Sequence, residues 1–165
     1  MDDIAKEIGV TRPALYYHFT SKEELFLAVY ESIDPLAHVS IEQVLATTNR
    51  EAYELAFKRL MQDIIGNLHD DKERAEFVAT VESTSLQVPS VLDSVRAQND
   101  SLHEAFRSAF QHGIDIGALP AMFSTAIAAQ YLVILVYGMS EALLRSENPD
   151  WNTLWPLIAD TLFHS

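Results

Sequence analysis

The sequence predicts an all-α protein that has a small N-terminal helical unit and a larger helical body. Apolar residues recur at helical spacing along most of its 165 residues, whereas the alternating pattern of β-strands is scarce. Proline and glycine fall between the periodic segments, where they would end helices. A break at Asp34-Pro35 separates residues 1–33 from residues 34–165, because proline clashes with the preceding helical turn. We therefore expect two domains with these bounds.

Two short helices joined by a glycine turn are predicted at the start of the chain. The first helix has one apolar face, formed by Ile4, Ala5 and Ile8. Gly9 can adopt the left-handed conformation that ends a helix, and Thr11 can cap the next helix, which runs to about Phe19. A small core should close between them through Val10, Leu15 and Phe19. Ser21 and Glu24 then form the S-x-x-E capping box of a third helix.

The body is expected to be a series of further helices. Periodic apolar residues and the breaks between them predict helices at 36–46, 52–68, 72–87, 91–113, 121–146 and 151–163. The segment from Ile116 to Ser140 carries no charge, but Pro120 and several polar residues interrupt it. A membrane-spanning helix needs about 20 apolar residues. A helix buried in a core or in a subunit interface therefore explains this segment better than a membrane span.

Composition argues against several classes of function. The net charge is −13, and an acidic chain repels DNA at long range, so binding through a general basic surface is not expected. Most of this acidity lies beyond residue 30, because residues 1–30 carry three basic and five acidic side chains. The sequence has no cysteine, no nucleophile elbow, no Gly-rich phosphate loop and no metal-ligand spacing. We therefore expect no enzyme activity, no cofactor, no metal site and a cytoplasmic location.

The N-terminal helices have the pattern of a helix-turn-helix, in which the second helix enters the major groove of DNA. Seven residues suited to this contact lie outside the small core: Thr11, Arg12, Pro13, Tyr16, Tyr17, His18 and Lys22. Arg12 can reach guanine edges or phosphates, and tyrosine hydroxyls can donate to phosphates. Lys22 lies in the first turn of the third helix, beside free N–H groups that also bind phosphate. Tyr16 could instead belong partly to the core, and Lys22 could be an ordinary solvated lysine.

The order of these residues resembles the DNA-binding region of TetR-family (tetracycline-repressor-type) transcriptional regulators. That family typically reads D-I-A-x-x-A-G-V-S-x-x-x-L-Y-x-H-F-x-S-K-E-x-L, and this sequence reads DIAKEIGVTRPALYYHFTSKEEL. The resemblance covers residues 2–30, with Ile8 where alanine is common and Thr11 where serine is common. It implies that the seven residues face double-stranded operator DNA, with Lys22 on the DNA backbone.

One departure from the family pattern concerns the start of the motif. The family places a complete helix before the helix-turn-helix, whereas this sequence begins inside what should be the motif's first helix. We therefore expect an N-terminally incomplete unit over residues 1–33, in which Ile4, Leu15 and Phe19 lack part of their cover. The alternative to a DNA-binding regulator is an α-helical small-molecule-binding or interaction protein that no longer binds DNA.

The resemblance implies that residues 34–165 form an all-α ligand-binding and dimerisation domain. The last two helices would join a homodimer through Leu132, Leu135, Val136, Met139, Leu154, Leu157, Ile158 and Leu162. Aromatic and methionine residues, with two polar ones, could hold a ligand: Phe57, Met61, His103, Phe106, Phe110, Met122, Gln130, Tyr131 and Tyr137. Both sets could instead be plain monomer core. The expected function is a homodimeric repressor that a small molecule releases from its operator.

Overall fold

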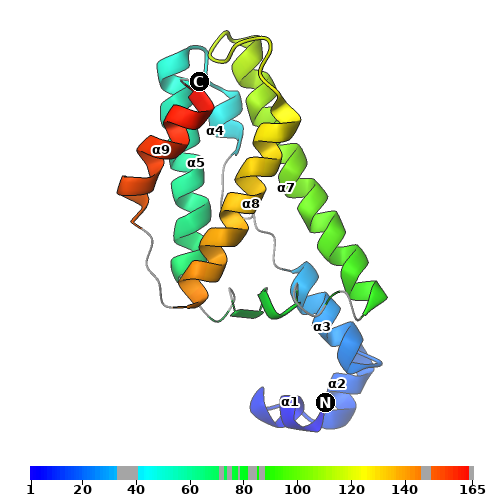
Figure 1. Cartoon of the computed structure of the whole chain (residues 1–165). Coiled ribbons are helices and arrows are strands. Elements are labelled where there is room, and N and C mark those ends of the chain that lie inside the picture. Colours follow the sequence, from blue (N-terminus) through cyan, green and yellow to red (C-terminus); the bar gives the residue numbers. More distant parts are fainter. Residues whose placement is uncertain are drawn as a thin grey trace. The chain divides into compact units, whose positions relative to one another are not determined.

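The computed structural model describes residues 1–32, 41–70, 73, 76–77, 79–81, 85, 88–145 and 150–163. These residues form helices and turns with no β-strand among them, which confirms the all-α fold class. The chain divides into two compact units, Met1–Asp34 and Pro35–Ser165, within one residue of the boundary that the sequence predicts. Figure 1 shows the helices of each unit.

The first unit consists of short helices that begin and end at the predicted signals. They are α1 (Asp2–Glu7), α2 (Arg12–His18) and α3 (Lys22–Glu31). Gly9 turns the chain after α1 with a φ of +73°, the left-handed conformation that glycine adopts without strain. The hydroxyl of Thr11 accepts a hydrogen bond from the backbone N–H of Ala14, and the hydroxyl of Ser21 accepts one from Glu24. Both predicted N-caps are therefore present.

The core of this unit is smaller than the sequence predicts. Ala5 and Leu15 are buried, so the expected loss of cover at Leu15 is wrong. Two further residues of the predicted core are half-buried: Ile4 and Phe19. Ile8 and Val10, which were expected to pack inward, are 58% and 42% exposed. Helices of six and seven residues bury only the face between them, and these two residues lie in the turn beyond that face.

The second unit contains the longer helices. Its described helices are α4 (Ile41–Leu45), α5 (Arg50–Asp70), α7 (Pro89–Asp115), α8 (Thr125–Leu144) and α9 (Trp151–Phe163). The helix predicted over 72–87 lies largely outside the described residues, as does the first half of the one predicted over 36–46. The bounds of α9 agree with the prediction of 151–163.

Three helix starts differ from the prediction for identifiable reasons. α5 begins two residues early because the side-chain oxygen of Asn49 accepts the N–H of Ala52 at 3.0 Å, a cap that the sequence analysis missed. α7 begins at Pro89, since proline lacks the N–H that a first helical residue leaves unpaired. α8 begins at 125 instead of 121, because Gly117 has a φ of +72° and the turn extends past Pro120.

The core of the second unit is rich in aromatic rings. α8 packs along α7 and also contacts α5, which in turn contacts α9 (Figure 1). Phe57 of α5 stacks on Phe110 of α7 with ring centroids 5.1 Å apart, and Phe163 of α9 meets Phe57 edge-on at 5.6 Å. Among the described residues, no helix combines the length and apolar character that crossing a membrane requires.

Tyr53 links α5 to α7 inside this core. Its ring is fully buried, and its hydroxyl donates a hydrogen bond to the carbonyl of Ala109 at 3.0 Å. Burial raises the pKa of this hydroxyl, because the phenolate form would lose its hydration. The ring lies against the backbone of Gly113, where no side chain intervenes.

Candidate nucleic-acid interface

The seven residues predicted to contact DNA are all exposed in the first unit. Six of them lie on α2 and at its N-cap, and Lys22 is the first residue of α3. Tyr17 is the most exposed aromatic residue among them, at 85%, whereas Tyr16 is 39% exposed. An aromatic side chain as exposed as Tyr17 gains nothing from the core, so its place on α2 suits contact with a partner.

Local hydrogen bonds stabilise the bend between α2 and the start of α3. The carboxylate of Glu24 accepts from the backbone N–H and the hydroxyl of Thr20, at 2.6 and 2.5 Å, and the backbone N–H of Ser21 also bonds to it, as the predicted capping box requires. These bonds lower the pKa of Glu24, the Thr20 hydroxyl contributing most. Bonds to Glu24 therefore fix the conformation of both Thr20 and Ser21, and Lys22 follows directly after them.

Arg12 has two contacts, each with a different part of its guanidinium group. Its Nε lies 3.1 Å from Oδ1 of Asp2 in α1, and its Cζ lies 5.4 Å from the centre of the Tyr16 ring. The ion pair connects the two helices of the helix-turn-helix, and a cation over an aromatic face is attracted by the ring. The sequence does not predict the contact of Asp2 with Arg12, because no spacing rule connects residues ten apart on different helices.

His18 completes the exposed aromatic group on α2. Its ring lies edge-on to that of Tyr17, with centroids 5.0 Å apart. Within the described part of the chain, no three His, Asp or Glu side chains are grouped closely enough to hold a metal ion. His18 can donate or accept a hydrogen bond at the groove, as its exposure allows.

The predicted ligand residues lie in three environments. The four aromatic and methionine residues of α5 and α7 are fully buried in the core: Phe57, Met61, Phe106 and Phe110. His103 and Tyr137 are half-buried, whereas Gln130 and Tyr131 are exposed on α8. Met122 is 91% exposed in the turn before α8. Their role in holding a ligand stays a prediction.

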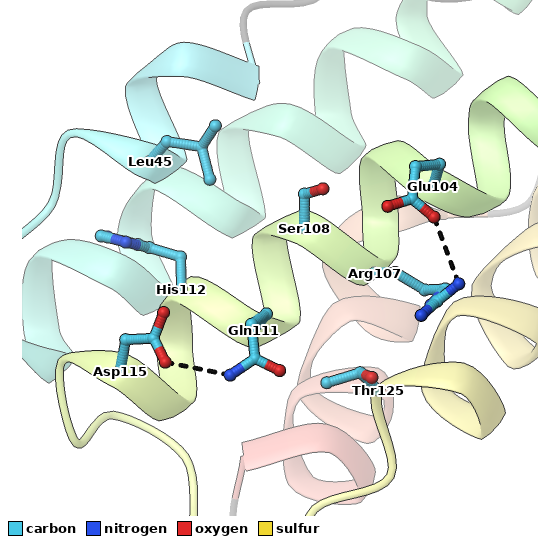
Figure 2. Close-up of a pocket in the computed structure, with 8 residues that line it drawn as sticks. All are labelled: Leu45, Glu104, Arg107, Ser108, Gln111, His112, Asp115 and Thr125. Atoms are coloured by element: carbon cyan, nitrogen blue, oxygen red, sulfur yellow. Dashed lines mark hydrogen bonds and ion pairs between the residues drawn. The ribbon is translucent and has the colours of Figure 1, made fainter.

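A cavity of about 390 Å³ lies on the second unit, and none of these nine residues lines it (Figure 2). It is lined by Leu45 of α4, by Glu104, Arg107, Ser108, Gln111, His112 and Asp115 of α7, and by Thr125 of α8. Arg107 pairs with Glu104 at 3.2 Å, and Gln111 donates to Asp115 at 2.9 Å. The wall is therefore polar, and a ligand there would exchange these pairs for its own.

The predicted dimer residues are mostly buried within one chain. Leu132, Val136, Met139, Ile158 and Leu162 are each under 10% exposed, and Leu135 and Leu154 are half-buried. Leu157 is 66% exposed on α9. Two further apolar residues on α8, which are not among the predicted set, are exposed: Ile127 at 70% and Ile134 at 63%. They share a face with Tyr131 because the three are spaced four and three apart. The assignment of an interface stays a prediction.

This arrangement defines the first unit as a helix-turn-helix, the class in which a second helix reads DNA. Residues 1–29 match the family model described as bacterial regulatory proteins, tetR family. The chain therefore carries the N-terminal helix-turn-helix of the TetR family, followed by a larger helical region. The resemblance predicted from the sequence is confirmed.

Two relatives show how far this similarity extends. The HTH-type transcriptional activator FasR of Mycolicibacterium smegmatis is 46% identical over 59 residues, which are 34% of this chain and 26% of FasR. The nucleoid occlusion factor SlmA of a Marinomonas species is 22% identical over 170 positions, which cover 96% of this chain and 82% of SlmA. The chain thus spans about a quarter of the length of FasR.

Proposed function

We propose that the chain is a cytoplasmic, non-enzymatic transcriptional regulator that binds an operator as a homodimer. We further propose that it acts as a repressor and that a small molecule releases it from the operator. One observation carries the DNA-binding part: Arg12, Tyr17 and His18 are exposed together on α2, directly before Lys22 at the start of α3. The TetR-type helix-turn-helix of residues 1–29 supports the same assignment.

The dimensions and chemistry of α2 suit the major groove. A helix of seven residues is about 10 Å long, and the groove is about 12 Å wide. Arg12 offers donors to guanine, while Tyr17 can donate to a phosphate or lie against a thymine methyl group. Lys22 supplies a cation for the adjacent backbone. Because the chain is acidic as a whole, sequence-independent attraction contributes little, and we expect binding to depend on these few contacts.

The test is selection of bound sites from a pool of random DNA duplexes, followed by affinity measurements on the enriched site. Arg12→Ala and Tyr17→Ala should each weaken binding by about fivefold or more, since one good base contact contributes about 1–3 kcal/mol. Arg96→Ala is the matched control, because Arg96 is equally exposed but lies on α7. Unchanged affinity in both α2 variants contradicts the assignment. If no site is enriched, the alternative of a helical binding protein without DNA contact stands.

The homodimer is supported by the apolar face of α8 that contains Ile127, Tyr131 and Ile134, together with Leu157 of α9. Exposed apolar residues that share a helix face mark interfaces more often than scattered ones do. A two-fold dimer would place two α2 helices on half-sites about one DNA turn apart, so the enriched site should be a palindrome.

Sedimentation of single-residue variants tests this interface. Ile134→Glu should shift the protein from dimer to monomer, because a carboxylate would be buried against the partner. Leu55→Glu is the control, since Leu55 is 49% exposed on α5, outside the proposed face. Equal effects of the two variants, or none, contradict an interface on α8.

Release by a small molecule can be tested with compounds that raise the melting temperature, because a ligand that binds only the folded state stabilises it. A compound that acts as the effector should also release the enriched DNA. His103→Ala and Gln130→Ala should abolish its effect if the predicted residues hold it. Ser108→Leu should do so if the polar cavity holds it, because the larger side chain would occupy that space. A stabilising compound that leaves DNA binding unchanged contradicts this part of the proposal.

A further inference from the structure

We propose that Asp2 is a positioning residue that orients Arg12 for a guanine in the operator. Asp2 lies closest to the Nε edge of the guanidinium group and the Tyr16 ring lies beside its Cζ, so that the end carrying the two Nη groups would be presented to the groove. This inference rests on the proposed DNA-binding function and adds to it a residue on α1, outside the reading helix.

The two contacts restrain different motions of the same group. The ion pair joins Nε of Arg12 to Oδ1 of Asp2 at 3.1 Å and restrains the position of that edge of the guanidinium group. The centre of the Tyr16 ring, 5.4 Å from Cζ, restrains the middle of the group. Both ends of the ion pair are more than half exposed, so its effect on stability is small. Its consequence lies in the orientation of Arg12.

The unused donors match one kind of acceptor. A guanidinium has five N–H donors, and the group approaches Asp2 most closely at Nε. Among the described residues, no hydrogen bond is found for the Nη groups of Arg12. The two Nη groups together can donate to O6 and N7 of one guanine, the commonest specific contact of arginine. A phosphate oxygen accepts from any of the five donors, so orientation matters for the base and hardly for the backbone.

Asp2 also brings a negative charge close to DNA, and this charge weakens binding, whereas orientation of Arg12 strengthens it. Removing that charge should strengthen binding to any sequence, because fewer phosphates are repelled. Loss of orientation should weaken binding only where a guanine is read. Asp3 provides a matched control: it lies beside Asp2 on α1, is exposed and carries the same charge, and no contact with Arg12 is found for it in the described chain.

The first measurement needs no DNA. The Nε–H resonance of Arg12 is recorded by NMR in the full chain, together with its rate of hydrogen exchange. Asp2→Asn should shift this resonance and speed its exchange, whereas Asp3→Asn should change neither. An Arg12 signal that is the same in wild type and in Asp2→Asn would show that Asp2 does not orient Arg12, and the proposal would be overturned.

The second measurement uses the enriched site and the same site with the guanine that Arg12 contacts replaced by adenine. Asp2→Asn should weaken binding to the enriched site by about two- to fivefold, the range expected of an exposed ion pair. It should also reduce the ratio of the affinity for the guanine site to the affinity for the adenine site. Asp3→Asn should strengthen binding to both sites alike. In an Arg12→Ala background, Asp2→Asn should no longer weaken binding.

The outcomes separate this proposal from the proposed function. If Asp2→Asn strengthens binding to both sites as Asp3→Asn does, Asp2 is only a repelling charge and the proposal fails while DNA binding stands. The proposal is also overturned if Asp2→Asn still weakens binding in the Arg12→Ala background. If wild type enriches no site, the proposed function fails and the guanine contact with it, whereas the NMR measurement still decides whether Asp2 orients Arg12.

Discussion

Replacing Gly113 with alanine should destabilise the helical body, because no space exists beside this glycine. An alanine Cβ would lie 2.6 Å from Cζ of Tyr53, 2.8 Å from its hydroxyl oxygen and 2.9 Å from a methyl group of Leu119. Overpacking of this kind costs about 1–3 kcal/mol. A shifted Tyr53 would also strain its buried hydrogen bond to Ala109, whose full loss costs about 1–3 kcal/mol. Since alanine has a helix propensity about 1 kcal/mol more favourable than that of glycine, we expect a net loss of about 1–5 kcal/mol if that bond is lost.

Urea unfolding followed by circular dichroism measures this loss, and a second glycine supplies the control. Gly66 lies inside α5, and no neighbouring atom comes within 4 Å of the position that an alanine Cβ would take there. Gly66→Ala should therefore stabilise the body by about 0.5–1 kcal/mol. The two substitutions are chemically identical, and their effects should have opposite signs. A Gly113→Ala protein as stable as Gly66→Ala would refute the reasoning that Tyr53 cannot move away.

Three further predictions concern polar contacts. Thr20→Val removes the hydroxyl that most lowers the pKa of Glu24, so an NMR titration should show this pKa rising toward its ordinary value. Because the pKa of Glu24 is lowered in the folded state, the contact stabilises the fold above the ordinary carboxyl pKa. This stabilisation is lost as the pH falls through the lowered pKa. Ser21→Ala should cost α3 about 1 kcal/mol, and unchanged amide exchange in its first turn would argue against the cap. Thr47→Val removes a hydroxyl that donates to the carbonyl of Val44 at 2.7 Å and lies 3.2 Å from Nε2 of His112, so it should lower the free energy of unfolding by about 1 kcal/mol in urea; no change would contradict stabilisation by this hydroxyl.

The first unit could be predicted from the sequence largely because its signals are local. Gly9, Thr11 and Ser21 each determine the conformation of a few neighbouring residues, and each does so in the structure as expected. The exposure of the seven candidate DNA-contact residues followed from the same local pattern. Nothing in that pattern depended on distant parts of the chain, so the spacing of residues was sufficient.

Features that depend on how helices meet were predicted less well. Ile8 and Val10 have apolar side chains, but their exposure depends on the short length of α1 and α2, which spacing alone does not fix. The contact between Asp2 and Arg12 exists only because two helices cross. On α8, apolar residues face both the core and solvent, so periodicity could not separate Leu132, which is buried, from Ile134, which is exposed.

The bond between Arg50 and the carbonyl of Phe163 has a consequence for the order in which the protein forms during synthesis. Nη2 of Arg50, at the start of α5, donates to that carbonyl at the end of α9, 113 residues later. Trp155, Ile158 and Phe163 of α9 also fill the core of the second unit. On the ribosome, the local contacts of α1 to α3 can form early. The core of the helical body is completed only after α9 has been synthesised, and until then the apolar surface of the body is exposed. The helical body is thus the part of the nascent chain that would most need a chaperone.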